Sequence, residues 1–395
     1  MRVLHVLKTT DGGPWAAAQV SELSHMGVEL HVAVPPGDGL YVNEWRASGA
    51  KLHFVSLDFP SSQPWLLQSV CRSARELVED VKPDLIHSHF VGTTLTLRYA
   101  LGKSHPIPRV FQIPGPLHLE HWFWRNLELS SAGRNDHWIA TSRYMYDRLR
   151  QAGLGPERVS FSYYGWYLDG AGGRRTNVLR DRLGIQDNEI VVGNISWLYP
   201  PKRYLGQRVG IKCHEDMIDA LAIVVRQRPD VVGVLAGGAF YGATWYEKRL
   251  RQRAEKAAGD RIKMPGKLPP AAARDCWPDF DCAIHVPLSE NCGGVMEPLL
   301  AGVPTIAGRV GGLPEVVIDG ATGKTVPIRR PAELADAVLE VLDNLDFYRR
   351  LAANGRVRVM ELFDVRRTTC EIYTIYARVL NAPPFRLHKL PVAAI

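Results

Sequence analysis

Short apolar runs alternate with helix-forming segments along most of the chain, and this alternation constrains the fold more than any other feature. The run RVLHVL near the N-terminus ends close to a Gly-Gly pair, and a helical pattern follows before the next apolar run. Similar runs recur in VELHVAV, DLIHSHF and HWIATS. Such a rhythm indicates strand–helix–strand units, in which helices cover both faces of a parallel sheet. We therefore expect an α/β fold of the doubly wound type.

The rhythm lapses once and then restarts, which predicts two domains of the same kind. Residues 165–187 are rich in glycine and polar side chains and are typical of a linker. The chain has 395 residues, and about 100–200 residues form a typical domain. We expect Rossmann-like domains at residues 1–170 and 187–360, with a C-terminal helix at 361–383 packing back on the first. The last residues, NAPPFRLHKLPVAAI, resemble a loose tail.

The stretch SENCGGVMEPLLAG places two carboxylates around a glycine turn. Ligands of open α/β sheets bind at the carboxyl ends of the strands, and this turn follows the apolar run CAIHVPL. Glycines let a ligand approach the backbone, and the following helix N-terminus attracts phosphate. Glu297 would then reach a ribose diol, and Glu290 would reach sugar hydroxyls. The alternative is a tight turn with no ligand, because glutamate in a first helical turn is favourable by itself.

The longer run HVPLSENCGGVMEPLLAGVPTIAGRVGGLPEVV resembles a known family. It is similar to the signature of retaining, two-domain (GT-B) glycosyltransferases of family 4, also called glycosyl transferases group 1. The resemblance covers most of the C-terminal half, whereas the N-terminal half is similar in its rhythm and in DLIHSH. It implies two Rossmann-like domains facing across a cleft and a nucleotide diphosphate-sugar as donor.

The resemblance also implies roles for the residues around the glycine turn. Glu297 would bind the ribose of the donor, and Glu290 would contact the transferred sugar. The base would be held by loop groups near residues 265–268. The spacing between the two glutamates is one residue shorter than usual, in a form that a subset of the family shares. The donor-binding backbone would comprise Asn291, Cys292, Gly293, Gly294 and Val295.

A diphosphate leaving group needs cations, and a basic loop offers them. Enzymes that work without a metal ion use lysine and arginine for this purpose. The resemblance puts the lysine at Lys212, with Arg203 or Arg208 as its partner, while Trp197 stands where the family arginine is expected. The alternative is a solvated basic loop. We expect no metal ion and no cofactor.

Two further positions are implied in the N-terminal domain. Gly12 and Gly13 follow the first apolar run, at a turn that in the family lies near the phosphates and the acceptor. The family often has a histidine near the reacting sugar, but this chain has Pro114 there, and His118 could replace it. The alternative for His118 is an ordinary loop histidine.

Several other motifs are interpreted as structural. His87 and His89 share one face of a strand, but metal binding would need more ligands. Asp279 and Asp281 form a DxD motif just before a strand, where the family has a structural aspartate. Residues 121–125 combine aromatic rings with bases that could contact sugar rings or a membrane interface. We expect at least two of them in the core.

Charge and composition limit the kinds of partner that the protein can bind and the compartment in which it can act. The net charge of +7 favours an anionic partner such as a nucleotide phosphate or an acidic lipid surface. The six cysteines form no CxxC pair, which suits a reducing cytosol. The N-terminus does not resemble a signal peptide, and the longest uncharged run, residues 231–246, is too short to span a bilayer. We expect a cytoplasmic protein that can contact the inner membrane face.

The leading hypothesis is a metal-independent retaining glycosyltransferase. It would pass a sugar to a glycan or lipid-linked acceptor, as in the synthesis of cell-surface polysaccharide or glycoconjugates. One alternative keeps the fold but makes the protein a nucleotide-sugar epimerase or hydrolase. Another is a non-catalytic nucleotide-sugar-binding protein. Nucleic-acid binding is not expected, since the basic residues are dispersed and no binding motif is present.

Overall fold

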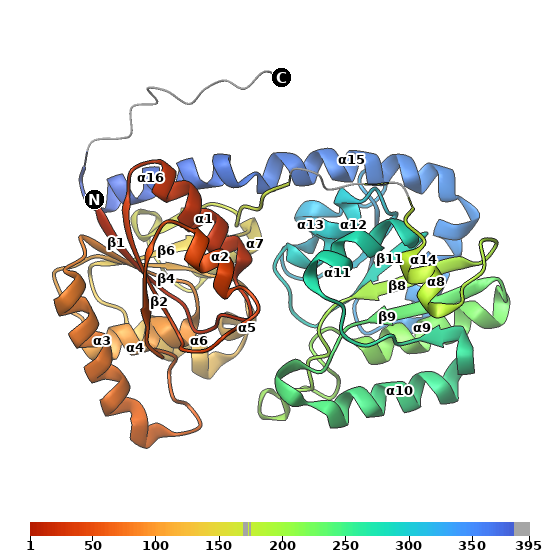
Figure 1. The fold of residues 1–395 in the computed structure, drawn as a ribbon, viewed down its shortest axis with the longest axis horizontal. Helices are drawn as coiled ribbons and strands as arrows, with labels where there is room; N and C mark the ends of the chain where they lie inside the picture. Colours follow the sequence, from red (N-terminus) through yellow and green to blue (C-terminus); the bar gives the residue numbers. More distant parts are fainter. Residues whose placement is uncertain (169–172, 174, 383–395) are drawn as a thin grey trace. The chain divides into compact units, whose positions relative to one another are not determined.

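The computed structural model describes residues 1–168, 173 and 175–382, and it divides the chain into two compact units (Figure 1). Unit 1 comprises Met1–Pro114, His118–Tyr167 and the chain from Phe363 onward. Unit 2 comprises Gly115–Leu117 and Leu168–Leu362. Each unit contains its own parallel sheet and its own hydrophobic clusters.

Unit 1 is built on a seven-stranded sheet with the order β3-β2-β1-β4-β5-β6-β7, and all neighbouring strands are parallel. The strands are β1 (Arg2–Val6), β2 (Glu29–Val34), β3 (Lys51–Phe54), β4 (Leu85–Ser88), β5 (Arg109–Gln112), β6 (Asp136–Ala140) and β7 (Val159–Phe161). The helices are α1 (Pro14–His25), α2 (Val42–Ala47), α3 (Leu67–Val81), α4 (Val91–Leu101), α5 (Leu117–Glu120), α6 (Trp122–Ser131), α7 (Arg143–Gln151) and α16 (Val365–Val379).

Local sequence explains how the main helices of unit 1 begin. Pro14 opens α1, where its missing N–H is not needed, and Gly13 precedes it with a φ of 81° that favours glycine. Asp364 caps α16 by accepting a hydrogen bond from the backbone N of Arg367 at 2.9 Å. Helix α16 packs beside α1 and buries Ile372 and Tyr376 in the core of unit 1.

Unit 2 is built on a six-stranded parallel sheet with the order β10-β9-β8-β11-β12-β13. The strands are β8 (Ile190–Ile195), β9 (Val231–Ala236), β10 (Ile262–Lys263), β11 (Cys282–His285), β12 (Thr305–Gly308) and β13 (Lys324–Val326). The helices are α8 (Val178–Leu183), α9 (His214–Gln227), α10 (Thr244–Ala258), α11 (Pro270–Cys276), α12 (Met296–Leu300), α13 (Leu313–Val316), α14 (Pro331–Asp343) and α15 (Leu345–Phe363).

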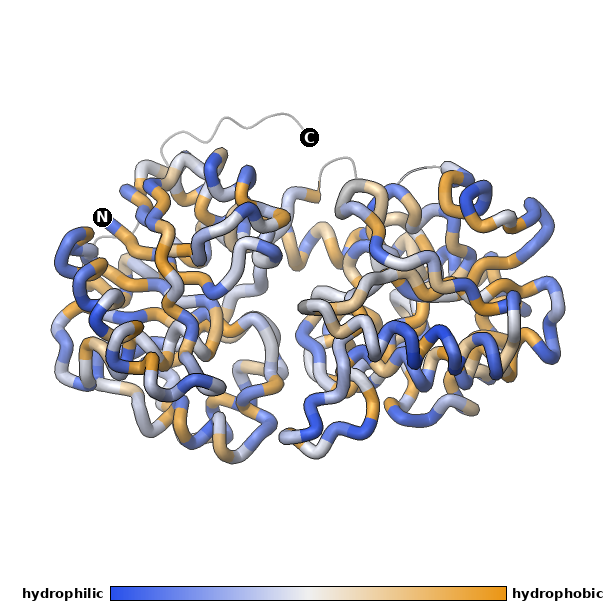
Figure 2. The backbone as a smooth tube through the Cα atoms, turned by 60° about the horizontal axis from the view of Figure 1, so that its bottom comes forward, coloured by the Kyte–Doolittle hydropathy of each residue, from blue (hydrophilic) through white to orange (hydrophobic). Residues whose placement is uncertain are grey.

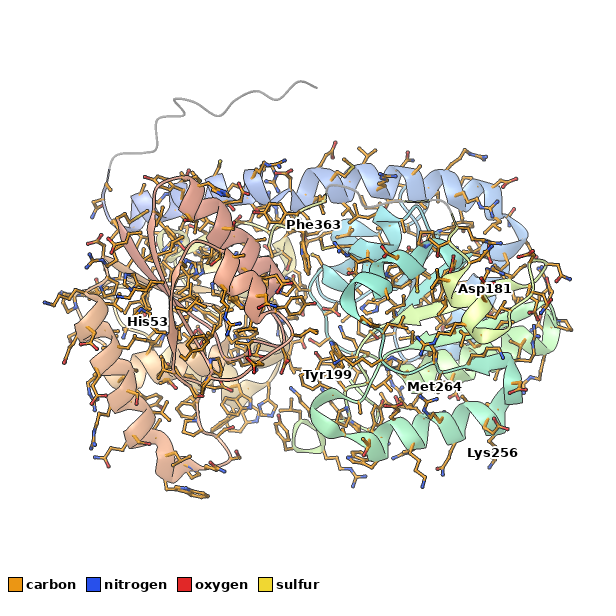
Figure 3. The ribbon with its side chains drawn as sticks, in the orientation of Figure 1. His53, Asp181, Tyr199, Lys256, Met264 and Phe363 are labelled. Atoms are coloured by element: carbon orange, nitrogen blue, oxygen red, sulfur yellow. The ribbon has the colours of Figure 1, made fainter. Side chains whose placement is uncertain are left out.

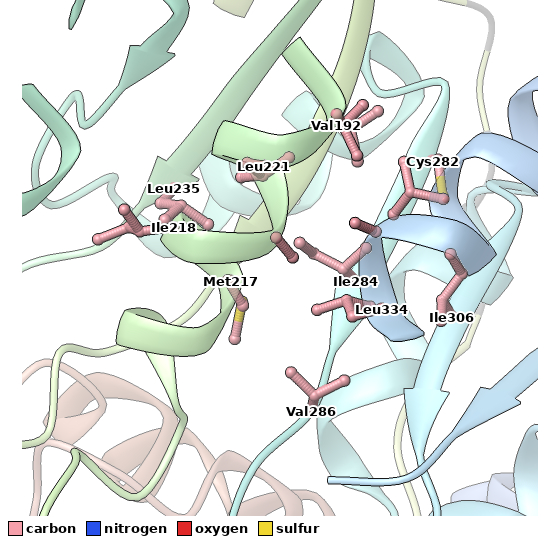
Figure 4. Close-up of a cluster of buried hydrophobic side chains, with 14 of the residues drawn as sticks. Val192, Met217, Ile218, Leu221, Leu235, Cys282, Ile284, Val286, Ile306 and Leu334 are labelled. Carbon is pink, nitrogen blue, oxygen red and sulfur yellow. The ribbon is translucent and has the colours of Figure 1, made fainter. Parts of the chain in front are cut away.

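The core of unit 2 forms where β8, β9, β11 and β12 meet helices α9 and α14. Ile218 and Leu221 from α9 and Leu334 from α14 lie over Val192 and Ile284 of the sheet (Figure 4). In Figure 2 hydrophobic residues follow the interior of each unit, and hydrophilic residues follow the outer helices and turns. The sheet is therefore covered on its apolar faces, as the near-continuous apolar strands require.

Both sheets contain a topological switch point, which is where ligands bind in open α/β sheets. In unit 1 the chain winds outward from β1 to β3 and then restarts on the other side at β4. In unit 2 it winds from β8 to β10 and restarts at β11. The carboxyl ends of β1 and β4, and those of β8 and β11, are therefore the places to look for a site.

The expected doubly wound architecture is confirmed, with two differences in detail. The edge strands β7 and β13 were not expected, and each has only three residues. The expected linker at 165–187 contains helix α8 (Val178–Leu183). Residues 169–172 and 174 of that linker, and residues 383–395 of the expected tail, lie outside the described part of the chain.

Candidate functional site

The glycine turn lies at the carboxyl end of β11, and its two glycines have different surroundings. Strand β11 ends at His285, and the turn leads through Gly293–Val295 into α12. A Cβ atom added to Gly294 would overlap the imidazole ring of His285, whereas a Cβ on Gly293 would meet nothing within 4 Å. Gly294 is therefore required for space beside a buried histidine, and Gly293 is open to a ligand.

Glu290 is held by three donors at this turn. Its Oε2 accepts hydrogen bonds from the Lys212 ammonium and, at 3.1 Å, from His285 Nε2. Its Oε1 accepts one from the backbone N of Asn291 at 3.1 Å. Burial alone would raise the pKa of the Glu290 carboxyl, but Lys212 and His285 together outweigh burial and lower that pKa. Glu290 is therefore a carboxylate at neutral pH, paired with a lysine.

A line of hydrogen bonds leads from the interior of unit 2 to Glu290. His214 Nε2 lies 3.2 Å from Ser196 Oγ, which donates to Asn194 Oδ1 at 2.5 Å. Asn194 Nδ2 lies 3.2 Å from Nδ1 of His285, the neighbour of Glu290. We call these four residues, His214, Ser196, Asn194 and His285, the unit 2 histidine chain. The sequence did not point to it, because residues on different strands and helices form it.

Glu297 lies in the first turn of α12, as expected, and is half-buried. Its Oε2 accepts a hydrogen bond from the indole N–H of Trp277 at 3.2 Å. Burial raises the pKa of Glu297, although Trp277 and Arg274 act in the opposite direction. A carboxyl group in such surroundings gains from further donors, and ribose hydroxyls can supply them.

Of the three cations expected near the diphosphate, the structure brings one to the glutamates. Lys212 precedes α9 and pairs with Glu290. Arg203, in a short 3₁₀ turn, and Arg208 are both exposed. Neither arginine forms an ion pair with any residue that the structure describes.

Aromatic side chains surround the carboxyl ends of β8 and β9. The ring of Trp197 has the Lys267 ammonium 5.1 Å from its centre, and the rings of Tyr199 and Phe240 lie 4.0 Å apart. Lys267 belongs to the loop 265–268, where the base was expected. Figure 3 labels Tyr199 in these loops, in contrast to Lys256, which points outward from α10. The rings offer stacking surfaces at the edge of the sheet where the glycine turn lies.

The DxD motif has a structural role, as expected. Asp279 accepts hydrogen bonds from the backbone N atoms of Thr176, Asn177 and Leu179 at 2.8–2.9 Å. Asp281 forms an ion pair with Arg180 at 2.7 Å. Both carboxylates thus tie the segment around α8 to the sheet of unit 2.

The residues expected to act from the N-terminal domain lie in unit 1. Gly12 and Gly13 form the turn between β1 and α1. His118 lies in α5 and is buried against the ring of Phe111, with its Nε2 3.8 Å from the buried carboxylate of Glu128. Glu128 also pairs with Arg98 at 3.1 Å. These surroundings are those of a structural histidine.

The expectation for the aromatic stretch 121–125 is wrong. None of its five residues is fully buried, and Trp122 and Phe123 are 65% and 46% exposed. Helix α6 instead turns Glu128 toward the interior, where the carboxylate accepts a hydrogen bond from Trp138 at 2.6 Å. The inward face of α6 is therefore used for a buried polar group, and its first rings lie outside.

His87 and His89 meet a third histidine, His5, which the sequence analysis did not single out. His5 pairs with His87 in the register of β1 and β4, and one ring nitrogen from each histidine lies within 4.8 Å of the others. All three rings are buried, and burial lowers the pKa of each, to about 3 for His5. The rings are therefore neutral at physiological pH.

A backbone carbonyl sets the direction of the hydrogen bonds among these rings. The hydroxyl of Tyr164 donates to the carbonyl of Gln112 at 2.9 Å, because a carbonyl can only accept. Tyr164 must then accept from Nδ1 of His89 at 3.3 Å, which leaves Nε2 of His89 as an acceptor. That atom lies 2.9 Å from Nδ1 of His5, which donates to it.

The same reasoning continues to helix α16. Nε2 of His5 accepts from the hydroxyl of Tyr376 at 3.3 Å, and the oxygen of Tyr376 accepts from Nδ1 of His87. All three rings thus carry their proton on Nδ1. A metal ion bound at this place would have to replace these hydrogen bonds. We call these residues, His5, His87, His89, Tyr164 and Tyr376, the unit 1 histidine network.

Comparison with known proteins agrees with this fold. The sequence profile described as Glycosyltransferase Family 4 matches residues 15–165, and the one described as Glycosyl transferases group 1 matches residues 203–358. The two profiles match the two units in turn. The chain belongs to the family 4 glycosyltransferases of the GT-B fold.

Individual relatives are more distant. The chain is 26% identical over 235 residues to a D-inositol 3-phosphate glycosyltransferase of Nocardioides sp., covering 56% of this chain and 49% of that protein. It is 33% identical over 204 residues to an N-acetyl-alpha-D-glucosaminyl L-malate synthase of Bacillus anthracis, covering 51% and 49%. The chain thus spans about half the length of these curated relatives.

A solved structure shows the same fold over nearly the whole chain. Anabaena HepE, solved in complex with UDP and glucose, has a TM-score of 0.77 and 22% sequence identity. The match covers 95% of this chain and 99% of that one. No helix in the described part of the chain is long and apolar enough to cross a membrane.

Proposed function

We propose that this protein is a metal-independent, retaining glycosyltransferase that moves a sugar from a nucleotide diphosphate-sugar to an acceptor. One observation carries the proposal: Glu290, Lys212 and Glu297 gather around the glycine turn at the switch point of unit 2. Family membership supports it, and the Nocardioides relative named above is a glycosyltransferase by name.

Each residue of the site has a distinct role in this proposal. Glu297 accepts hydrogen bonds from the ribose diol, and the open backbone at Gly293 approaches the diphosphate. Lys212, which uses one N–H on Glu290, can direct its others to the diphosphate. Glu290 then orients the transferred sugar. Arg203 or Arg208 supplies the second cation when the donor binds.

The reaction requires no group on the protein to form a covalent bond to the sugar. The bond between the anomeric carbon and the diphosphate oxygen breaks, and the acceptor hydroxyl forms a new bond to that carbon on the same face. The hydroxyl proton passes to the departing diphosphate. Lys212 and the arginine stabilise the negative charge that develops on that diphosphate.

The donor can be identified by a binding screen. UDP, GDP, ADP and their glucose conjugates are added to the protein first without and then with EDTA, and the unfolding midpoint is measured. A ligand that binds only the folded state raises the midpoint by mass action. We expect one nucleotide to do so in EDTA. A shift that EDTA abolishes would contradict metal independence, and no shift with any of them would contradict the donor site.

Two glutamine substitutions separate the roles of the two carboxylates of the site, and a third serves as control. Glu297→Gln should weaken nucleotide binding about 10-fold, in line with the loss of one charge-assisted hydrogen bond. Glu290→Gln should leave nucleotide binding within a few-fold of wild type but reduce turnover about 100-fold. Glu255→Gln, on the exposed face of α10, is the matched control and should change neither. Wild-type turnover in Glu290→Gln would refute its role.

We further propose that the protein acts in the cytoplasm and contacts the inner membrane face, where a lipid-linked acceptor would lie. The net charge of +7 and the exposed rings of Trp122 and Phe123 support this location. The test is sedimentation with vesicles of neutral or anionic lipid. We expect the protein to sediment with the anionic vesicles, and we expect this binding to fall with added salt and in a Trp122→Ser, Phe123→Ser variant. If as much protein sediments without vesicles as with them, the proposed membrane contact would be contradicted.

A further inference from the structure

His285 is a buried side chain that touches Glu290 and that the proposed reaction does not yet use. We propose that His285 is a positioning residue: a neutral imidazole with its proton on Nε2, oriented by Asn194, that fixes the Glu290 carboxylate for sugar transfer. Its effect on turnover rests on the proposed function, whereas its protonation pattern does not.

The carbonyl of Ile284 sets the orientation of the Asn194 amide. This carbonyl accepts a hydrogen bond from Asn194 Nδ2 at 2.9 Å, and only the NH₂ group of the amide can donate it. The same NH₂ group lies 3.2 Å from Nδ1 of His285. An amide nitrogen cannot accept, so Nδ1 of His285 must accept and carries no proton.

The remaining proton of His285 therefore lies on Nε2. Burial lowers the pKa of this imidazole, with Lys212 acting in the same direction and Glu290 against it. A neutral ring that accepts at Nδ1 donates at Nε2, and Nε2 lies 3.1 Å from Oε2 of Glu290. The N–H thus points at the carboxylate.

The rest of the unit 2 histidine chain supports this orientation of the amide. Ser196 donates its hydroxyl proton to Asn194 Oδ1, so its oxygen accepts from Nε2 of His214. Burial lowers the pKa of His214 to about 3, and this ring is neutral too. Every hydrogen bond from His214 onward therefore points toward Glu290.

This arrangement leaves part of the carboxylate available to substrate. Oε2 is taken by His285 and Lys212, while Oε1 accepts only from the backbone of Asn291 among the residues that the structure describes. A carboxylate oxygen can accept two hydrogen bonds, so Oε1 has room for a sugar hydroxyl. Because the missing Cβ of Gly294 makes space for the His285 ring, the glycine turn and the histidine act as one unit.

The protonation pattern is tested on the whole protein without substrate. Long-range ¹H–¹⁵N correlation on protein labelled at histidine nitrogens distinguishes the two neutral tautomers from the charged ring. The His285 signals are assigned from their absence in His285→Gln. We expect the Nε2-H form at pH 7.5. The Nδ1-H form or an imidazolium would overturn the proposal.

The positioning role is tested with a pair of substitutions and UDP-glucose as probe. His285→Leu removes the donor, whereas the amide of His285→Gln can still donate to Glu290. UDP release should fall about 100-fold in His285→Leu, because a misplaced group costs that much, and should recover at least 10-fold in His285→Gln. The KM for UDP-glucose and the binding of UDP should stay within 3-fold of wild type in both.

Other outcomes separate this inference from the proposed function. Wild-type turnover in His285→Leu would overturn the positioning role. Equal losses of UDP binding and turnover in both variants would also overturn it, since they would indicate a structural role. If the wild-type protein binds no nucleotide in the screen above, the proposed function fails, and the tautomer of His285 still tests the hydrogen-bond assignment.

Discussion

Each unit buries a set of histidines at the switch point of its sheet, but the two sets end differently. The unit 1 histidine network ends on the backbone carbonyl of Gln112, a neutral group inside the core. The unit 2 histidine chain ends on the carboxylate of Glu290, beside a lysine at the glycine turn. The first network is closed on the protein itself, and the second ends on a charged group that a ligand can meet. Burial of histidine alone therefore does not mark a functional site.

The proton positions differ in the same way. In unit 1 the three rings carry their proton on Nδ1, because the chain of donors starts at His87 and ends at a carbonyl. In unit 2 His214 and His285 carry it on Nε2. In each unit the acceptor at the end of the hydrogen-bonded series, the Gln112 carbonyl or the Glu290 carboxylate, thus fixes the tautomers of the histidines that lead to it.

The largest expected effect is on stability in acid, and both sets contribute to it. Burial lowers the pKa of His5 and His214 to about 3 from an ordinary value of 6.5. Below pH 6.5 the histidines of the unfolded chain bind protons that the buried rings of the folded protein do not. The contribution of these rings to the free energy of unfolding is therefore fully present above pH 6.5 and is lost as the pH falls toward 3. Each such ring should cost about 1.4 kcal/mol per pH unit in that window.

Denaturant unfolding at pH 7.5, 6.5 and 5.5 measures this loss. We expect little change between the first two values and a fall of several kcal/mol by pH 5.5. His5→Gln and His214→Gln should each flatten the fall by about 1.4 kcal/mol per unit. A free energy of unfolding that is constant down to pH 5.5 would show that the rings are not neutral and buried.

The next largest effect is expected when one added methyl group disrupts the site of unit 2. Gly294→Ala places a Cβ against the ring of His285, which must move away from Glu290. We expect UDP-glucose turnover to fall about 100-fold and the free energy of unfolding to fall by about 1–3 kcal/mol. Gly293→Ala is the matched control for stability alone, because its Cβ would meet no protein atom. Equal losses of unfolding free energy in the two variants would contradict the special role of Gly294.

A smaller effect is expected when the unit 1 histidine network is disrupted. Tyr376→Phe removes the hydroxyl that joins His5 to His87 and leaves a buried donor and acceptor without it. The free energy of unfolding should fall by about 1–3 kcal/mol, with UDP binding unchanged. Tyr99→Phe, at a ring that is 46% exposed, should change it by less than about 0.5 kcal/mol. Loss of UDP binding in Tyr376→Phe would place the network in the donor site.

The sequence predicts what is local and periodic in this protein. The strand–helix rhythm gave the doubly wound fold, and the glycine turn led to Glu290 and Glu297. The edge strands β7 and β13, of three residues each, were missed. At least two of residues 121–125 were expected in the core, but α6 presents Trp122 and Phe123 outward.

The sequence could not predict contacts that depend on three-dimensional register. Asn194 and His285 are 91 positions apart and meet only because β8 and β11 are neighbours in the sheet. The same holds for His5 and His89, which are 84 positions apart. The sequence signal that could have pointed to His285 is its position: it is a histidine at the end of the apolar strand that precedes the glycine turn.

The most direct test of this account follows the five histidines of the unit 1 histidine network and the unit 2 histidine chain while nucleotide is added. The nitrogen resonances of His5, His87, His89, His214 and His285 are assigned by single substitutions, and UDP and then UDP-glucose are titrated in EDTA. We expect Nδ1-H tautomers in unit 1, Nε2-H tautomers in unit 2, and ligand-dependent shifts for His285 but none for His5, His87 or His89. Shifts in unit 1 with an unchanged His285 would contradict the assignment of the site to unit 2.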